Sequence, residues 1–399
     1  MKKIASSLLL GAAANASAAN FGEDLAFLQK HTDVVVLADK SGNSKVAIVP
    51  AWQGRVMSST ATGDAGLSFG WINRELIATQ KVQPHINVFG GEDRFWLGPE
   101  GGQFSIYFAK GVAFDFEHWF TPAPIDTEPF KVVKAAKDKA SFRHQFTLNN
   151  YSGTAFEVKV DREVRLLSAK DTWKKLGVPA AEHVQLVAFE SANKITNVGK
   201  NTWKKETGLL SIWILGMLNP SPATTIVVPI KAGTEAELGK AVTADYFGQV
   251  PPERLVVRDS VLFFSGDGKC RGKIGISPKR CKPVLGSYDA ANKVLTIAQF
   301  TFNDGVTDYV NSQWKLQEHP YAGDVANSYN DGPVTPGGKP LGPFYELESS
   351  SPAAALAAGK SLEHVHRTIH LTGPENELDV IAQAALGVTL KEITTALPR

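Results

Sequence analysis

Short runs of β-branched and aromatic residues, separated by turn-forming residues, recur along this chain and constrain its fold more than any other feature. Turn-forming sequences such as SGN at residues 41–43 and GDG at residues 266–268 lie between the runs. Helical periodicity is confined to residues 22–30 and 378–386. Because parallel sheets need helices between their strands, the pattern predicts an all-β fold, a large antiparallel sandwich. The predicted strands are residues 34–37, 46–49, 104–108, 156–160, 184–189, 226–230, 255–264 and 294–302.

The composition is that of one large domain. The chain has 399 residues, 43% of them hydrophobic and 21% charged, which is enough for a sizeable core. Its net charge of +2 is nearly balanced and indicates neither a nucleic-acid partner nor an anionic membrane surface. No stretch of the sequence approaches the ~20 apolar residues of a membrane-spanning helix. We therefore expect a single domain over residues 20–399, with no nucleic acid and no membrane span.

The N-terminal residues have the order of a secretory signal peptide. Lys2 and Lys3 supply a positive start, residues 4–14 are mostly apolar and small, and residues 16–18 form an A-x-A cleavage pattern. We expect residues 1–19 to be a signal peptide that is removed. The mature protein would then be periplasmic or secreted.

Cys270 and Cys281 are the only two cysteines in the sequence. In an exported protein, two cysteines this close predict a disulfide that braces a hairpin. A metal site is the alternative, but the sequence nearby has no other thiol or imidazole ligand.

Two carboxylates, Glu346 and Glu348, lie two positions apart in a strand-like run near the C-terminus. Side chains alternate across a strand, so both carboxylates face one way while Tyr345 and Leu347 face the other. Neighbouring acids repel each other and raise each other's pKa, which makes a purely structural role costly. This segment is therefore the first candidate for acid–base chemistry.

Three histidines, His364, His366 and His370, share one face of the next predicted strand together with Thr368. Alternating histidines can chelate a metal, and Glu348 could complete the ligand shell. The alternative, which we favour, is that these histidines pair with carboxylates or face solvent.

A second unusual segment, residues 87–108, has glycine pairs on both sides of a cluster of charged residues and tryptophan. Arg94 offers a planar fork of donors, and Trp96 offers an apolar face with an N–H group. A sugar ring needs both, because its C–H face stacks on an aromatic plane while its hydroxyls form hydrogen bonds. The segment predicts sugar binding by Asp93, Arg94 and Trp96, with Glu100 as a catalytic group. The alternative is a buried Arg–carboxylate network that holds the loop.

Further polar and aromatic side chains extend this candidate sugar site. Trp119 offers a stacking platform, and His85 is preferred over His118 as a catalytic imidazole. Asn197 and Lys205 offer hydrogen bonds to hydroxyls or carboxylates, unless they serve only as turn and surface residues.

Residues 313–344 form a long segment without a regular pattern, dense in polar and aromatic side chains. Long irregular loops in a compact domain are usually functional or disordered, and the aromatic content argues against disorder. We expect Trp314 and Asn327 from this segment to contact a saccharide. The alternative is a Ca²⁺ site, although no known ligand spacing is matched. Its oxygen ligands would be Asp324, Asn327, Asn330 and Asp331.

These segments resemble the galactose mutarotase-like superfamily, which includes the aldose 1-epimerases. KVAIVPAWQGRVMSSTATG resembles the opening strand pair of the superfamily, and YELESSSPAAALAAGKS resembles the strand that presents its catalytic Glu. GGEDRFWLGPEGG and SANKITNVG are similar to an exported branch. The resemblance spans most of residues 34–371 and implies an antiparallel β-supersandwich that binds a sugar on its concave face. It also implies that Glu348 is the general base. We expect the neighbouring Glu346 to contact the sugar, and we expect no cofactor.

The chain departs from the superfamily's pattern in its histidines. In active mutarotases the Glu takes the proton of the anomeric hydroxyl while a His protonates the ring oxygen. Here Trp203 and Trp213 occupy the region after Asn197 where a histidine is expected. Three functions therefore stay open: an aldose mutarotase or epimerase, a non-catalytic carbohydrate-binding protein, and a glycan lyase or hydrolase with paired acids. Each has a mono- or oligosaccharide as its partner.

Overall fold

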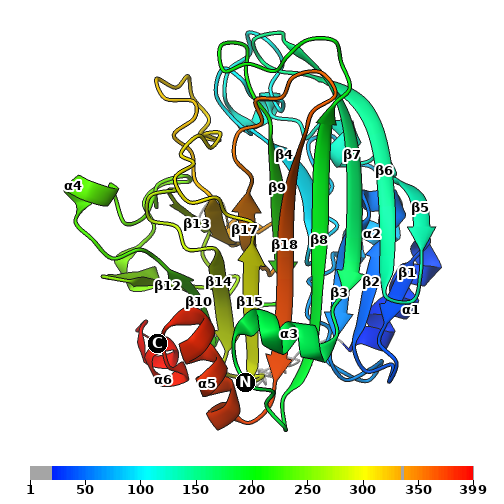
Figure 1. The fold of residues 1–399 in the computed structure, drawn as a ribbon, viewed down its shortest axis with the longest axis vertical. Coiled ribbons are helices and arrows are strands. Elements are labelled where there is room, and N and C mark those ends of the chain that lie inside the picture. The colour runs from blue at the N-terminus through cyan, green and yellow to red at the C-terminus, as the bar shows by residue number, and fades with distance from the viewer. Residues whose placement is uncertain (1–19, 334–336, 399) are drawn as a thin grey trace, which may run out of the picture.

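Two antiparallel β-layers stand one behind the other in a computed structural model that describes residues 20–333 and 337–398 (Figure 1). Among the described residues, the front layer is a ten-stranded sheet with the order β11 (Leu255–Arg258), β12 (Val261–Ser265), β10 (Thr224–Pro229), β14 (Val284–Asp289), β15 (Val294–Phe300), β18 (Ser361–Thr372), β8 (Gln185–Asn197), β7 (Ala155–Leu166), β6 (Lys139–Asn149) and β5 (Lys131–Ala135). The rear layer, in the same part of the chain, is a five-stranded sheet with the order β13 (Gly272–Ile276), β16 (Ala326–Asn330), β17 (Tyr345–Ser350), β9 (Ser211–Leu218) and β4 (Arg94–Gly98). The all-β, antiparallel prediction is confirmed.

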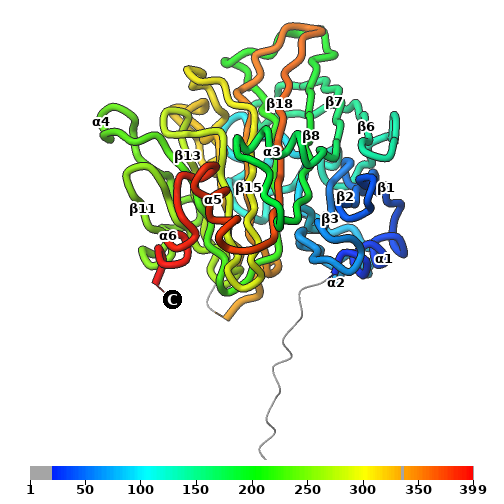
Figure 2. The backbone as a smooth tube through the Cα atoms, turned by 60° about the horizontal axis from the view of Figure 1, so that its bottom comes forward, coloured from blue at the N-terminus to red at the C-terminus, as the bar shows by residue number. Residues whose placement is uncertain are grey.

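A smaller sheet and the helices cover the remaining faces. The sheet of β1 (Val35–Ala38), β2 (Lys45–Val49) and β3 (Arg55–Thr60) packs with α1 (Phe21–His31) and α2 (Arg74–Thr79). On the front of the ten-stranded sheet lie α3 (Ala169–Leu176), α5 (Glu375–Leu386) and α6 (Leu390–Thr395), while α4 (Glu235–Leu238) projects at one side (Figures 1 and 2). Short 3-10 turns are formed by Pro50–Trp52, Phe116–His118, Ala123–Ile125 and Pro252–Arg254. None of the helices in the described residues is long and apolar enough to cross a membrane.

The two predicted helices are confirmed, and local chemistry accounts for their positions. The helix expected at residues 22–30 is α1, whose N-cap Asn20 accepts a hydrogen bond from the backbone N–H of Glu23. The helix expected at residues 378–386 is α5, and its buried side chains pack against the ten-stranded sheet. Both helices therefore bury one apolar face, as their periodicity predicts.

The main core lies between the two layers and decides which side chains face away from it. Phe95 and Leu97 of β4 and Ile212 and Ile214 of β9 are fully buried in this core. Because strand side chains alternate, the residues between them project from the opposite, outer face of the five-stranded sheet. That outer face carries the candidate site.

Two strand predictions and one loop prediction differ from the structure. Residues 104–108 are not a strand, because this segment folds back on itself: the Tyr107 hydroxyl donates to the Leu97 carbonyl and Ser105 Oγ donates to the Glu100 carbonyl. Residues 255–264 are divided into the hairpin β11–β12. The segment 313–344 is not irregular throughout, since it contains β16 in the middle of the rear sheet.

The predicted disulfide is wrong, because Cys270 and Cys281 are free thiols. The extended strand β13 (Gly272–Ile276) lies between them in the sequence. At ~3.3 Å per residue, a five-residue strand alone spans about 16 Å, whereas a disulfide needs Cα atoms less than ~7 Å apart. Cys281 is buried beside the Lys282 carbonyl, and burial raises the pKa of its thiol to about 12. The structure therefore contains a strand where the sequence predicted a bridged hairpin.

Candidate functional site

The outer face of the five-stranded sheet is the floor of a cavity of about 710 Å³, which adjoins a smaller cavity of about 120 Å³. Directly paired residues of neighbouring antiparallel strands project to the same face, so the register brings distant segments together. Two rows of directly paired residues lie on this face of the sheet. One row is Asn327, Glu348, Leu215 and Arg94, and the other is Lys273, Tyr329, Glu346 and Met217. We call the two joined spaces the sheet cavity.

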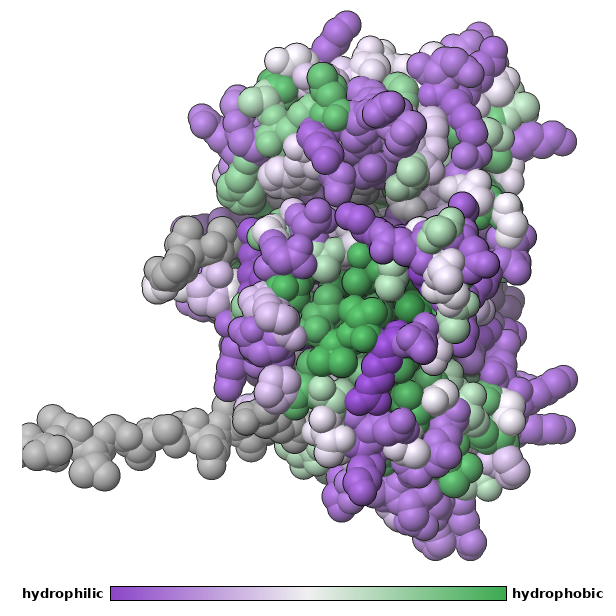
Figure 3. Space-filling model, turned by 90° about the vertical axis from the view of Figure 1, so that its left-hand side faces the viewer, coloured by the Kyte–Doolittle hydropathy of each residue, from purple (hydrophilic) through white to green (hydrophobic). Residues whose placement is uncertain are grey.

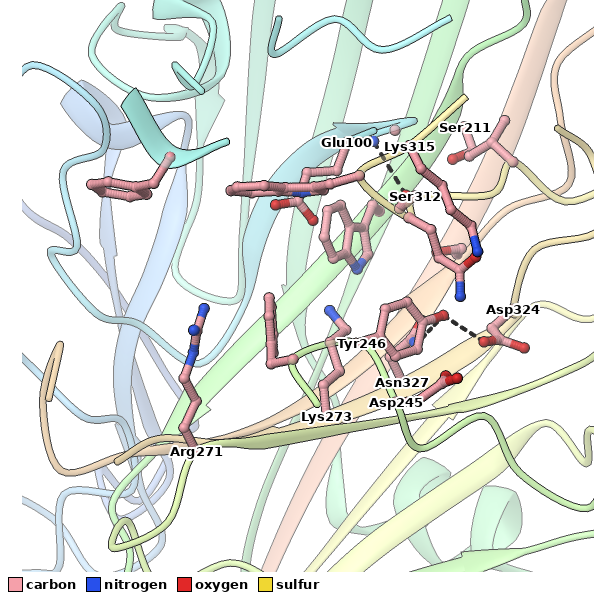
Figure 4. A pocket seen from close by; sticks show the side chains of 18 of the residues that line it. Glu100, Ser211, Asp245, Tyr246, Arg271, Lys273, Ser312, Lys315, Asp324 and Asn327 are labelled. Atoms are coloured by element: carbon pink, nitrogen blue, oxygen red, sulfur yellow. Dashed lines mark hydrogen bonds between the residues drawn. The ribbon is translucent and has the colours of Figure 1, made fainter. Parts of the chain in front are cut away.

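Loops from distant parts of the chain form the walls of the sheet cavity (Figure 4). Figure 4 shows Glu100 on one side and Lys273, Tyr246 and Asp324 on the other. The walls also include Phe116, Asp245, Phe247, Arg271, Ser312, Gln313, Trp314, Lys315 and Leu341. A space-filling view shows one face of the molecule hollowed, with hydrophobic side chains gathered inside a hydrophilic surround (Figure 3).

Glu348 lies beneath the floor of the sheet cavity rather than on its surface. The side chain is fully buried, and Oε2 accepts hydrogen bonds from Trp213 Nε1 at 2.9 Å and from Lys273 Nζ at 3.0 Å. Trp213 and Lys273 both line the cavity, whereas Glu348 does not. The two donors, Trp213 and Lys273, therefore connect Glu348 to the cavity. Lys273 is the charged donor of the two.

Glu346 reaches the smaller space and pairs with Arg94. Arg94 Nη2 lies 3.2 Å from Glu346 Oε1, and the guanidinium carbon is 4.0 Å from the centre of the Trp96 ring. Burial raises the pKa of Glu346 to about 8, with the charge of Glu348 acting in the same direction and Arg94 and Lys273 opposing it. At neutral pH the carboxyl of Glu346 is therefore largely protonated.

Two further carboxyl groups line the sheet cavity and have raised pKa values. Burial raises the pKa of Glu100, although the charge of Lys273 opposes the shift. Burial also raises the pKa of Asp324, to about 6, while a hydrogen bond from the Tyr246 hydroxyl at 2.5 Å opposes it. Asn327 Nδ2 donates to that same hydroxyl at 3.4 Å. Carboxyl groups with raised pKa values on facing walls are an arrangement that acid–base catalysis uses.

Aromatic side chains supply the apolar surfaces of the cavity. Trp119 and Trp314 are stacked with ring centres 5.7 Å apart, and Trp96 meets Trp213 edge-on at 5.5 Å. Lys273 Nζ lies 4.7 Å from the centre of the Trp213 ring. Such rings offer flat faces to the C–H groups of a ligand, while the charged groups beside them offer hydrogen bonds.

The predicted site residues divide into those at the cavity and those elsewhere. At least one of the two spaces is lined by Glu100, Arg94, Trp96, Trp119, Trp314, Asn327 and Glu346. Asp93 does not line it: its carboxylate is fully buried and accepts hydrogen bonds from Arg162 Nη2 at 2.6 Å and from Ser191 Oγ at 2.8 Å. For Asp93 the buried Arg–carboxylate alternative therefore matches the structure.

Three more predicted residues have local partners outside the cavity lining. His85 Nδ1 is 2.6 Å from the Trp119 carbonyl oxygen, which makes it a neighbour of the site. Asn197 Nδ2 donates to two backbone carbonyls and so holds a turn. Lys205 Nζ lies 2.6 Å from Asp308 Oδ2 in a half-exposed ion pair.

The histidines of β18 are hydrogen-bonded inside the core. His364 Nε2 and His366 Nδ1 each lie 2.8 Å from Ser349 Oγ, and His370 Nε2 lies 2.8 Å from Glu92 Oε2. Burial lowers the pKa of His364 to about 3 and that of His366 to about 4. In the part of the chain that the structure describes, no group of three or more His, Cys, Asp or Glu side chains is arranged to hold a metal ion.

The side chains of the calcium alternative have partners within the protein, and Asp324 and Asn327 share the Tyr246 hydroxyl. Asn330 Nδ2 donates to the Cys270 carbonyl, Asp331 Oδ1 accepts from the Tyr329 hydroxyl, and Asp324 accepts from Tyr246.

Several lining residues were missed by the sequence prediction. Arg271 and Lys273 are two positions apart in GKCRGKIGI, the spacing of neighbours on one face of a strand. This spacing indicates two side chains on one face of a strand. The disulfide interpretation of the same segment predicted a hairpin there instead. Tyr246 and Phe247 lie in a loop whose sequence carries no comparable pattern.

Known structures of similar fold include three whose names refer to sugar epimerisation. A candidate aldose 1-epimerase from Escherichia coli K12 has 13% identity and a TM-score of 0.49, and the match covers 86% of this chain and 99% of that one. A galactose mutarotase-like protein from Lactobacillus casei has 9% identity and a TM-score of 0.46 over 85% and 100% of the two chains. A galactose mutarotase related enzyme from Lactobacillus acidophilus has 10% identity and a TM-score of 0.45 over 86% and 97%.

These similarities extend over most of this chain, at identities of 13% or less. Comparison with curated proteins gives no match. A family described as of unknown function, DUF6786, matches residues 19–397. The chain therefore belongs to the DUF6786 family.

Proposed function

We propose that the protein is a carbohydrate-active isomerase of the aldose epimerase type, which binds a saccharide in the sheet cavity. One observation carries the proposal: Glu100, a carboxyl group with a raised pKa, lies opposite Lys273 and Asp324 in an aromatic-lined cavity of about 710 Å³. Ligand cavities are typically about 300–1,000 Å³ and combine apolar walls with a few convergent polar groups.

The proposed reaction is proton transfer around the anomeric carbon. Glu100, whose neutral form is favoured by burial, donates a proton to the ring oxygen, while the carboxylate of Asp324 takes the proton of the anomeric hydroxyl. The ring C–O bond breaks, an open-chain carbonyl forms, and the reverse transfers close the ring on either face. Glu348 acts as a positioning residue in this scheme, because it holds Lys273 through a 3.0 Å contact.

The pH dependence follows from these roles. The acid must be protonated and the base deprotonated, so the rate rises as pH increases through about 6, where Asp324 ionises. It falls again above the pKa of Glu100, which burial raises. The expected profile is bell-shaped.

Anomer exchange measured by NMR tests the proposal, with a panel of neutral and acidic monosaccharides. We expect the wild-type protein to accelerate exchange for at least one sugar, and Glu100→Gln and Asp324→Asn each to lower kcat by ~10²–10⁴-fold. Lys205→Ala is the matched control, since its ion pair lies outside the cavity lining. No acceleration of any sugar by wild-type protein would refute the isomerase.

A non-catalytic carbohydrate-binding protein is the second candidate, and one observation favours it. Glu348, the position that resembles the family's general base, has its Oε2 occupied by Trp213 and Lys273. Binding of a sugar without exchange or product formation, retained in Glu100→Gln, would support this candidate over the isomerase.

We further propose that the protein is exported and acts in the periplasm or outside the cell. The support is the charged start, apolar stretch and A-x-A pattern of residues 1–19, which lie outside the described residues.

A further inference from the structure

Donor groups without partners gather at the smaller space of the sheet cavity. Arg94 is only 2% exposed, and of its guanidinium only Nη2 has a hydrogen-bond partner, Glu346. Arg94 Nε and Nη1 are buried without a hydrogen-bond partner among the described residues. Buried donors left unpaired are costly, so they indicate a group that is supplied from outside the chain.

A second guanidinium lines the same space. Arg271 has its guanidinium carbon 3.9 Å from the centre of the Phe247 ring, and its Nε is likewise buried without a partner within residues 20–333 and 337–398. Lys273 is the third cation there, but its ammonium contacts the carboxylate of Glu348. Among these three cations, buried donors without a partner are therefore found on the two arginines.

The acids beside these arginines do not balance them fully. Glu346 and Glu100 line the space, and burial raises the pKa of both. Burial therefore favours the neutral form of both carboxyl groups, while Arg94 and Arg271 bring two guanidinium groups to the same space. An anionic ligand group would supply the missing acceptors and a charge opposite to that of the guanidinium groups.

We propose that the bound saccharide carries a carboxylate, as uronic acids do, and that this group lies between Arg94 and Arg271 in the smaller space. The inference rests on the proposed function and names its substrate class. A guanidinium binds a planar carboxylate through two parallel hydrogen bonds. The space of about 120 Å³ is small, so a planar carboxylate fits it better than a bulkier tetrahedral phosphate.

Isothermal titration with matched sugars tests the substrate class. Galacturonate and glucuronate are compared with galactose and glucose, from which they differ only at C6, and with galactose 6-phosphate. We expect a uronate to bind the wild-type protein roughly 10- to 100-fold more tightly than its neutral counterpart, as hydrogen bonds to charged groups allow.

Variants then assign the preference to the two arginines. Arg94→Gln and Arg271→Gln should each weaken uronate binding by about 10-fold or more and change neutral-sugar binding by less than about 3-fold. A merely structural role would weaken both sugars alike. Arg143→Gln, which removes an exposed ion pair on β6, is the control. Arg271 is the more exposed of the two arginines, so its variant keeps the test decisive if Arg94→Gln does not fold.

The outcomes separate this inference from the proposed function. Equal binding of neutral sugars and uronates by the wild-type protein would overturn the carboxylate assignment but leave a saccharide site. Preference for galactose 6-phosphate would overturn it in favour of phosphate. Absence of binding to every sugar would remove the proposed function and this inference together.

Discussion

Glu346 and Glu348 are two residues apart on one strand, yet they meet different partners. Glu348 accepts hydrogen bonds from Trp213 and Lys273 beneath the cavity floor, whereas Glu346 reaches the cavity beside Arg94. Burial and the charge of Glu348 raise the pKa of Glu346 to about 8. The neutral form of Glu346 is therefore favoured, which reduces its repulsion by Glu348.

The first prediction concerns the pH dependence of stability at Glu346. Because its pKa is raised on folding, its contribution to stability is complete below the ordinary value of 4.5 and is lost as pH rises toward about 8. Compared with Glu346→Gln, the wild-type protein should lose more than ~1 kcal/mol of unfolding free energy across this window. Urea unfolding at both ends of the window measures the loss. Glu363→Gln, on an exposed side chain, is the control, and parallel pH profiles of wild type and Glu346→Gln would contradict the assignment.

At the scale of elements, one buried ion pair connects the two β-layers. Arg162 on β7 donates to the carboxylate of Asp93, which directly precedes β4, and to the Gly54 carbonyl. Ser191 on β8 donates to the same carboxylate. Because the side chains of Asp93 and Arg162 have no exposed surface, each charge depends on the other for its compensation.

Breaking this pair should be severely destabilising. Asp93→Ala or Arg162→Ala leaves a buried charge unpaired, and we expect a loss of ~3–5 kcal/mol in unfolding free energy, measured by chemical denaturation. Asp64→Ala is the control, since its pair with Lys45 is largely exposed and should cost less than ~1 kcal/mol. Similar, small losses in all three variants would show that the layers do not depend on this pair.

At the scale of the whole molecule, the C-terminal strands occupy the middle of both layers. β18 lies between β15 and β8 in the ten-stranded sheet, and β17 lies between β16 and β9 in the five-stranded sheet. The strands on either side of β17 and of β18 are hydrogen-bonded to these C-terminal strands. Without the C-terminal segment, neither layer is therefore a continuous sheet (Figure 1). Neither half of the chain contains all the strands of either layer.

We accordingly predict that residues 20–399 unfold as one unit. Differential scanning calorimetry should give a single transition, and Asp93→Ala should shift the whole transition instead of splitting it, because the sheets are hydrogen-bonded without interruption. Two resolved transitions in the wild-type protein would contradict the single-domain prediction.

Much of the local structure could be predicted because it depends on neighbouring residues. The alternation of Tyr345, Glu346, Leu347 and Glu348 predicts correctly that the two carboxylates share one face of the strand and the two apolar side chains the other. The periodicity of residues 378–386 likewise predicts α5. The disulfide could not be excluded in this way, because the distance between Cys270 and Cys281 depends on the extended strand between them.

The sequence by itself determined the strand-rich class, the two longest terminal helices and the shared face of the glutamates, since these follow from periods of two or 3.6 residues. Only the tertiary structure decided that Lys273 and Trp213 lie between Glu348 and the cavity, and that Glu100 faces Asp324 across it. The physical reason is that strand order and register come from pairing between segments far apart in the chain. Asn327, Glu348, Leu215 and Arg94 form one row, although 254 positions separate Arg94 from Glu348 (348 − 94).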